Sequence, residues 1–207
     1  MNTKTVAVAI DGPAGAWKST IARRLAKNLE YIYVDTGALY RTVAFSLLSS
    51  GINTDDINAV IRHVKGINVD ITYKGDEQRV LLDGRDVSDF IRTPEVSMMA
   101  STTSAIPEVR AFLLGLQRKL AEEHNVVMDG RDIGTVVLPN ATTKIYLIAD
   151  LDVRTERRYK ELLKKVKEAI YMITTTGQSY TIGSRTLTRA NLTELRNFKN
   201  ELEQQVA

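Results

Sequence analysis

The stretch Gly12-Pro13-Ala14-Gly15-Ala16-Trp17-Lys18-Ser19 decides the fold class of this chain. It fits the phosphate-binding pattern G-x-x-x-x-G-K-[ST] except at one position, where Trp17 replaces the glycine before the lysine. In such a loop, backbone N–H groups at a helix N-terminus surround the β-phosphate, Lys18 bridges the β- and γ-phosphates, and the Ser19 hydroxyl binds Mg²⁺. The predicted ATP-binding residues are Gly12, Pro13, Ala14, Gly15, Ala16, Trp17, Lys18, Ser19 and Thr20, with Mg²⁺ held through the nucleotide.

The residues on either side of the loop support this interpretation. Residues 5–10 form a short β-branched and apolar run that is typical of a buried parallel strand. Residues 19–29 carry apolar side chains at helical spacing directly after the loop. A strand, a glycine-rich loop and a helix in this order favour a phosphate site over the alternative, an ordinary glycine-rich turn.

Trp17 is the departure from the pattern. The glycine at this position usually has a positive φ, which costs another residue about 1–2 kcal/mol. An indole there would also compete with phosphate for space. We therefore predict damaged nucleotide binding; the alternative is a shifted loop with the ring packed outward.

The rest of the chain alternates short apolar runs with helical patterns. Strands are predicted at 31–34, 126–128 and 144–148, and helices at 38–49, 54–65, 107–120 and from 152 onward. This alternation predicts an α/β fold with a parallel sheet covered on both faces. Residues 67–91 instead alternate apolar and polar side chains around a turn, which predicts a small antiparallel insertion.

Composition narrows the class of protein further. A chain of 207 residues suits one α/β domain with a small insertion or appendage. The formal net charge of +3 fits a protein that handles anionic ligands, but no basic run with interleaved aromatics indicates nucleic acid. The lack of cysteine excludes disulfides and thiolate metal sites. No signal-peptide pattern or membrane-spanning apolar stretch is present, so we expect a soluble, cytoplasmic protein without a membrane partner.

Three stretches resemble the bacterial cytidylate (CMP/dCMP) kinases: residues 9–15, 33–41 and 127–137. The third, Val-Met-Asp-Gly-Arg-Asp-Ile-Gly-Thr-Val-Val, is the most specific of them. The resemblance covers residues 1–165 and implies a P-loop nucleoside monophosphate kinase fold, with a monophosphate-binding insertion at about 62–100. It also implies an activity, transfer of the ATP γ-phosphate to CMP or dCMP with Mg²⁺, and nucleotides as the partners.

The resemblance carries roles over to single residues. Those expected to contact CMP are Thr36, Tyr40, Arg41, Ser101, Arg110, Asp129 and Arg131. Arginines suit the monophosphate because they form forked, charge-assisted hydrogen bonds, and Ser101 and Asp129 could bind the cytosine amino edge. The catalytic candidates are Lys18, Arg131, Arg157 and Arg158, the last two as a pair at the base of a mobile lid. Open alternatives are a helix cap for Ser101, a packed aromatic for Tyr40, structural roles for Asp129 and Arg131, and a solvated basic helix face for Arg157 and Arg158.

Residues 166–207 depart from that family, since its lid pattern and its last strand do not appear. Residues 178–185 and 187–190 resemble instead a helix–hairpin–helix unit of small phage-encoded proteins. The final helix carries an apolar stripe that consists of Leu192, Leu195, Phe198, Leu202 and Val206. Such a stripe needs a partner surface, either the preceding helix or a second copy of the chain. Two functions stay open: an impaired CMP/dCMP kinase, and a catalytically dead kinase-fold protein whose tail contacts a partner.

Overall fold

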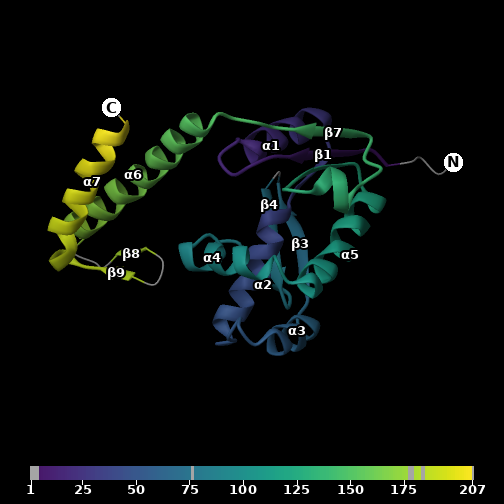
Figure 1. Ribbon diagram of the computed structural model, residues 1–207, viewed down its shortest axis with the longest axis horizontal. Helices are drawn as coiled ribbons and strands as arrows, with labels where there is room; N and C mark the ends of the chain where they lie inside the picture. Colours follow the sequence, from purple (N-terminus) through teal and green to yellow (C-terminus); the bar gives the residue numbers. More distant parts are fainter. Residues whose placement is uncertain (1–4, 76, 177–179, 183–184, 207) are drawn as a thin grey trace. The chain divides into compact units, whose positions relative to one another are not determined.

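The computed structural model describes residues 5–75, 77–176, 180–182 and 185–206 (Figure 1). The chain divides into two compact units. The first, here called the sheet unit, comprises Met1–Pro13 and Trp17–Leu147. The second, here called the tail unit, comprises Ala14–Ala16 and Ile148–Ala207. This division falls earlier in the chain than the predicted domain boundary at 165/166, which stays a prediction.

A parallel sheet forms the centre of the sheet unit. Its strands are β1 (Ala7–Asp11), β2 (Ile32–Asp35), β6 (Val126–Asp129) and β7 (Thr143–Tyr146), in the order β2-β6-β1-β7. Successive apolar side chains of β1 and β6 enter different buried clusters, because strand residues alternate between the two faces. Both faces of β1 and β6 are therefore buried, as their near-continuous apolar runs predicted. The edge strand β7 is instead largely exposed, with Tyr146 67% exposed, so the burial expected from the apolar run at 144–148 is wrong.

Helices cover both faces of this sheet. The helices of the sheet unit are α1 (Lys18–Leu29), α2 (Thr36–Ser49), α3 (Ile57–Gly66), α4 (Pro94–Thr103), α5 (Pro107–Glu123) and the short π-helix η1 (Ile133–Val137). Of these, α3 and α4 pack with α2 and the insertion, in a cluster that contains no residue of the parallel sheet. Ala22 and Ala26 of α1 pack in one cluster with Val8 and Ile10 of β1. On the other face, apolar side chains of α5 pack with those of β1, β2 and β6. The predicted two-sided α/β architecture is confirmed.

The antiparallel insertion packs against α2. It consists of β3 (Val69–Lys74), β4 (Glu77–Leu82) and β5 (Arg85–Asp86), with Val69 opposite Leu82. Val80 on β4 is buried in the same cluster as Leu39 and Val43 on α2. The small antiparallel sheet expected from the alternating pattern is therefore present.

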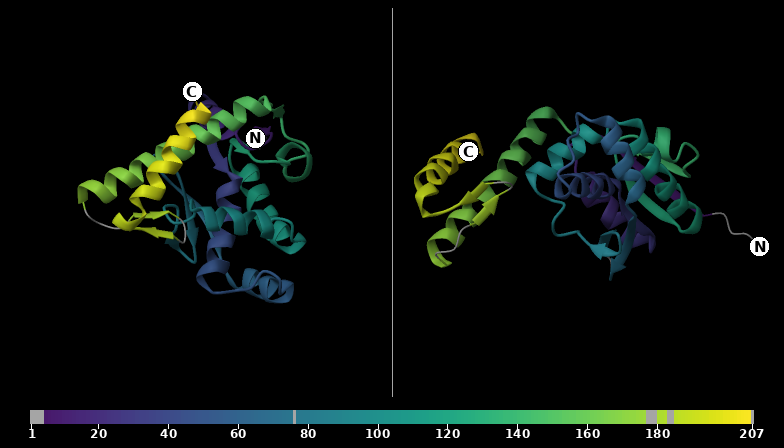
Figure 2. Two further views of the ribbon diagram at one scale, coloured as in Figure 1. Left: turned by 60° about the vertical axis from the view of Figure 1, so that its left-hand side comes forward. Right: turned by 90° about the horizontal axis from the view of Figure 1, so that it is seen from below.

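The tail unit has a core of its own. It contains α6 (Leu151–Thr176), β8 (Tyr180–Ile182), β9 (Arg185–Leu187), the 3₁₀ turn η2 (Arg189–Asn191) and α7 (Leu192–Val206). Figures 1 and 2 show α6 and α7 side by side. The hydrophobic cluster of this unit consists of Val166 and Ile173 on α6, Leu187 on β9, and Leu195 and Leu202 on α7.

The preceding helix is thus the partner surface of the apolar stripe on α7. Leu195 and Leu202 are buried against α6, whereas Phe198 is 41% exposed. The predicted helical C-terminal region is confirmed, although residues 177–179 and 183–184 of the hairpin lie outside the described residues. None of the described helices combines the length and hydrophobicity that a membrane crossing requires.

Candidate functional site

A cavity of about 720 Å³ lies in the sheet unit, at the carboxyl ends of β2 and β6. This is the edge at which open α/β sheets bind ligands. All the residues that were predicted to contact CMP line it: Thr36, Tyr40, Arg41, Ser101, Arg110, Asp129 and Arg131. Lys18 and Ser19 of the loop line it as well. We call it the larger cavity.

The loop that precedes α1 is held closely by the strands around it. A Cβ atom on Gly12 would lie 2.1 Å from the backbone oxygen of Leu147, so only glycine fits at this position. The Asp11 carboxylate accepts hydrogen bonds from the backbone N–H groups of Ile133 (2.7 Å) and Gly134 (2.8 Å), which joins the loop to η1. These contacts fix the path of the backbone into the loop.

Lys18 lies within the loop that it is expected to serve. Its Nζ donates a hydrogen bond to the backbone oxygen of Pro13 at 2.8 Å. Burial lowers the pKa of Lys18, and the nearby positive charge of Arg131 lowers it further. A phosphate ligand would stabilise the charged form of Lys18, because its negative charge would offset both the burial and the repulsion from Arg131.

Trp17 has the backbone conformation that the sequence pattern reserves for glycine. Its φ is 61° and its ψ is 20°, in the left-handed region, and it is the N-cap residue of α1. The positive φ predicted for this position is confirmed. The side chain is 56% exposed. The loop has therefore not shifted out of the left-handed conformation, and the residue bears the strain of that conformation.

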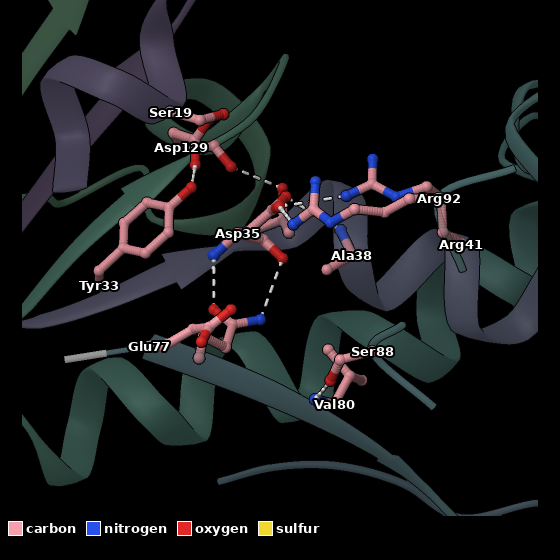
Figure 3. A network of polar contacts seen from close by, with 12 residues as sticks. Ser19, Tyr33, Asp35, Ala38, Arg41, Glu77, Val80, Ser88, Arg92 and Asp129 are labelled. Atoms are coloured by element: carbon pink, nitrogen blue, oxygen red, sulfur yellow. Dashed lines mark hydrogen bonds and ion pairs between the residues drawn. The ribbon is translucent and has the colours of Figure 1, made fainter. Parts of the chain in front are cut away.

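Asp129 joins the loop to the sheet (Figure 3). Its Oδ2 accepts a hydrogen bond from the Ser19 hydroxyl and its Oδ1 accepts one from the Tyr33 hydroxyl, both at 2.8 Å. The Thr36 hydroxyl donates to the Asp129 backbone oxygen at 2.8 Å. Burial, together with the nearby charge of Asp35, raises the pKa of Asp129 to about 6. Both carboxylate oxygens thus point toward the loop and β2.

Asp35 organises the other side of the larger cavity (Figure 3). Its Oδ1 caps α2 by accepting from the Ala38 N–H at 3.0 Å. Its Oδ2 accepts from Arg41 Nη2 at 3.1 Å and from Arg92 Nη2 at 3.4 Å. A Cβ atom on Gly37 would lie 3.0 Å from Arg41 Nη1, so glycine leaves room for that guanidinium. The Asp-Thr-Gly-x-x-x-Arg segment therefore positions Arg41.

Arg41 still carries an unsatisfied donor. Its Nε is buried and has no hydrogen-bond acceptor within the part of the chain that the structure describes. A buried donor of this kind costs free energy unless a ligand or water supplies an acceptor. The guanidinium is thus suited to an incoming oxyanion.

An ion pair that the sequence did not reveal also lines the larger cavity. Arg110 Nη2 pairs with Asp132 Oδ2, and this hydrogen bond raises the pKa of Arg110. Tyr40 lines the cavity beside them, and burial raises its pKa. Ser101 lies within α4, whose N-cap is Thr93, so the alternative of a capping role for Ser101 is wrong. Among the lining residues that sequence reasoning missed are Asp132, Asp35 and the buried Gln117.

Arg157 and Arg158 belong to the tail unit, on α6. Arg157 Nη1 donates to the backbone oxygen of Gly15, which is in the same unit, at 2.9 Å. Arg158 Nη1 pairs with Glu161 Oε2 at 2.9 Å on an exposed face of the helix. The position of Arg158 fits the alternative of a solvent-exposed basic helix face. A catalytic role for either arginine stays a prediction.

Comparison with known proteins adds two family matches. The family model described as Cytidylate kinase matches residues 8–175. A second model, described as a family of unknown function (DUF6148), matches residues 151–207, which include α6 and α7. The two matches overlap within α6. A phage origin of the tail is not shown by either.

Several curated cytidylate kinases are similar to this chain. That of Carboxydothermus hydrogenoformans is 49% identical over 164 residues, which cover 79% of this chain and 74% of the relative. That of Caldanaerobacter subterraneus is 50% identical over 167 residues, covering 81% and 73%. That of Bacillus cytotoxicus is 43% identical over 162 residues, covering 78% and 72%. With its loop, its sheet and its larger cavity in place, this chain belongs to the cytidylate kinase family.

Proposed function

We propose that this protein is a nucleoside monophosphate kinase that transfers the ATP γ-phosphate to CMP or dCMP, with an activity impaired by Trp17 and by the replaced lid. The observation that carries the proposal is the larger cavity, because Lys18, Ser19 and all seven predicted CMP residues line it. Phosphoryl transfer needs positioning and charge neutralisation rather than a covalent intermediate. A cavity that combines a phosphate loop with three arginines supplies both.

The monophosphate would lie against Arg41, Arg110 and Arg131. Arg41 supports this role most directly, since Asp35 orients its guanidinium while its buried Nε lacks an acceptor. A phosphate oxygen would satisfy that donor by a charge-assisted hydrogen bond. Arg131 lines the same cavity and lowers the pKa of Lys18, which indicates that the two cations face a common region. Two neighbouring cations are repulsive until an anion lies between them.

The donor atoms at the loop fit magnesium bound together with ATP. The Ser19 hydroxyl and the Asp129 carboxylate lie 2.8 Å apart and would both offer the oxygen ligands that Mg²⁺ prefers. Among the described residues, no three acidic, histidine or cysteine side chains form a metal site on their own, so the nucleotide would complete it. Bound Mg²⁺ would supply neutralisation of the phosphate charges. Lys18 would release the Pro13 carbonyl and pair with the phosphates.

Asp129 has a second candidate role besides the predicted contact with the cytosine amino group. Its carboxylate accepts from Ser19 and Tyr33, on the loop side of the cavity. The Arg110–Asp132 pair offers an alternative acceptor and donor for the base edge, together with Ser101 on α4. We infer that Asp129 acts on the magnesium side and that Asp132 is the carboxylate available to the base.

Calorimetric titrations with CMP and with Mg²⁺·ATP test the proposal. We expect CMP to bind more tightly than ATP, because the arginines of the larger cavity are present whereas the loop carries Trp17. Arg41→Ala should weaken CMP binding by about 10- to 100-fold, the effect of one or two charge-assisted hydrogen bonds. Arg62→Ala, an exposed substitution on α3 outside the cavity, is the matched control.

The same titrations distinguish the alternative function, a catalytically dead binding protein. Trp17 favours that alternative, because it alters the ATP loop and leaves the predicted CMP residues intact. Slow but measurable phosphorylation of CMP, lost in Lys18→Ala, supports the kinase. CMP binding without any turnover at saturating Mg²⁺·ATP would support the binding protein, and tight ATP binding without CMP binding would contradict both.

A further inference from the structure

A second, smaller cavity of about 360 Å³ lies on the insertion side of β2. Tyr33 and Asp35 of β2 line it, and so do Lys74 and Gln78 of the insertion. Gln78 binds the end of β2 closely: its Oε1 accepts from the Asp35 N–H at 2.7 Å. Asp35 is the single described lining residue that the smaller and larger cavities share.

Residues that line the smaller cavity also contact residues that line the larger one (Figure 3). Tyr33 lines the smaller cavity, and its hydroxyl donates to Asp129. Asp35 Oδ2 accepts from Arg41, which lines the larger cavity, and from Arg92, which lines the smaller one. One carboxylate oxygen therefore holds two guanidinium groups that belong to different cavities.

The charges around the smaller cavity favour an anionic ligand. Three cations from separate elements line it: Arg23 of α1, Lys74 of β3 and Arg92 before α4. Arg23 lies over the Tyr33 ring, 5.5 Å from its centroid. Two acidic residues also line the smaller cavity, Asp35, which accepts from three groups, and the exposed Glu77, so three cations face two carboxylates. Cationic side chains from separate elements that line one cavity attract phosphate groups.

We propose that the smaller cavity binds a small phosphate-bearing anion, and that this binding weakens CMP binding in the larger cavity. An anion there pairs with Arg92 and draws it away from Asp35. Asp35 still orients Arg41, but its carboxylate is no longer shared with Arg92 and therefore neutralises more of the guanidinium charge that the CMP phosphate would meet. The second half of this inference rests on the proposed function, whereas the first half does not.

Calorimetric titration of the full-length, nucleotide-free protein with inorganic phosphate tests the site itself. Lys74→Ala should weaken the binding of phosphate by about tenfold, the effect of one lost charged hydrogen bond. Lys65→Ala, an exposed lysine on α3, is the matched control and should bind as the unchanged protein does. Lys18→Ala is a second comparison, because it weakens any phosphate binding that takes place at the loop rather than in the smaller cavity. Equal affinity in Lys74→Ala and the unchanged protein, or a loss confined to Lys18→Ala, would overturn the proposal.

The coupling is tested by measuring the CMP dissociation constant at increasing phosphate and constant ionic strength. We expect a rise of about fivefold that reaches a plateau, as an allosteric coupling does, and its disappearance in Lys74→Ala. A rise without a plateau that persists in Lys74→Ala would mean simple competition in the larger cavity and would refute the coupling. If CMP does not bind at all, the proposed function fails, and the phosphate titration alone still decides whether the smaller cavity is a site.

Discussion

Replacing Trp17 separates two effects of this residue, the backbone strain of its left-handed conformation and the bulk of its indole side chain. The residue has a φ of 61°, so its backbone strain is part of the folded state. Strain that is equal before and after binding cancels from the affinity and appears only in folding stability. The effect of Trp17 on nucleotide binding must then come from the indole, which is 56% exposed.

The pair Trp17→Gly and Trp17→Ala makes this measurable. Both remove the indole, so both should raise ADP affinity by at least about tenfold, which is roughly 1.4 kcal/mol. Only glycine adopts the left-handed conformation freely, and alanine keeps a cost of about 1–2 kcal/mol. Trp17→Gly should therefore melt about 2–4 °C above Trp17→Ala for each kcal/mol of difference, in a chain of this size.

Titration calorimetry with Mg²⁺·ADP and thermal unfolding are the two assays. If glycine alone restored affinity and alanine did not, strain rather than bulk would control binding, and the cancellation argument would be refuted. If both variants bound as weakly as the unchanged chain, the loop would tolerate tryptophan. Full turnover is not expected from either variant, since arginines of the lid type each contribute orders of magnitude in rate.

Three further predictions concern stability. Gly12→Ala should lower the free energy of unfolding by more than about 3 kcal/mol, because the new Cβ would lie 2.1 Å from the Leu147 oxygen. Gly51→Ala is the control, since Gly51 also has a positive φ (+64°) but open space around it. Equal melting temperatures of the two variants would contradict the reasoning. Leu202→Ala on α7 should lower the free energy of unfolding by about 2–5 kcal/mol and speed up amide hydrogen exchange in α6. Phe198→Ala should change both quantities little, because Phe198 is 41% exposed. Equal effects of the two substitutions would mean that the stripe is not buried as described. The pKa of Asp129 is raised from 3.8 to about 6 in the folded protein, so its contribution to stability is present below the unfolded value and is lost as the pH rises through 6, by up to about 3 kcal/mol. In EDTA, the melting temperature of Asp129→Asn relative to the unchanged chain should then increase between about pH 4 and pH 7, and a constant difference would refute the shift.

The fold was largely predictable because its elements follow from local patterns. The buried runs of β1 and β6, the alternation in the insertion and the apolar stripe of α7 each determine their own element. The α4 helix was missed, since its sequence lacks a clear apolar period. Its start is nevertheless encoded, because Thr93 caps it and Pro94 occupies the first turn.

The residues that line the site were predictable from the sequence, but the orientations and pairings of their side chains were not. The residues predicted to contact CMP line one cavity because strand ends and the helices that follow them meet at one sheet edge. Their roles stay predictions. The direction of the Asp129 carboxylate depends on Tyr33, 96 positions away, and the pairing of Arg92 with Asp35 spans 57 positions. Contacts over such distances depend on the packed tertiary structure, which no local pattern specifies.

Trp17 also gives the protein a built-in optical reporter. It is the single tryptophan of the chain, so indole fluorescence originates from the loop and from nowhere else. More than half of its side chain is exposed to water, which makes its emission sensitive to any molecule that covers it. The residue that departs from the pattern thus allows ligand arrival at the loop to be followed in the unlabelled, unmodified protein, on the timescale of a stopped-flow experiment.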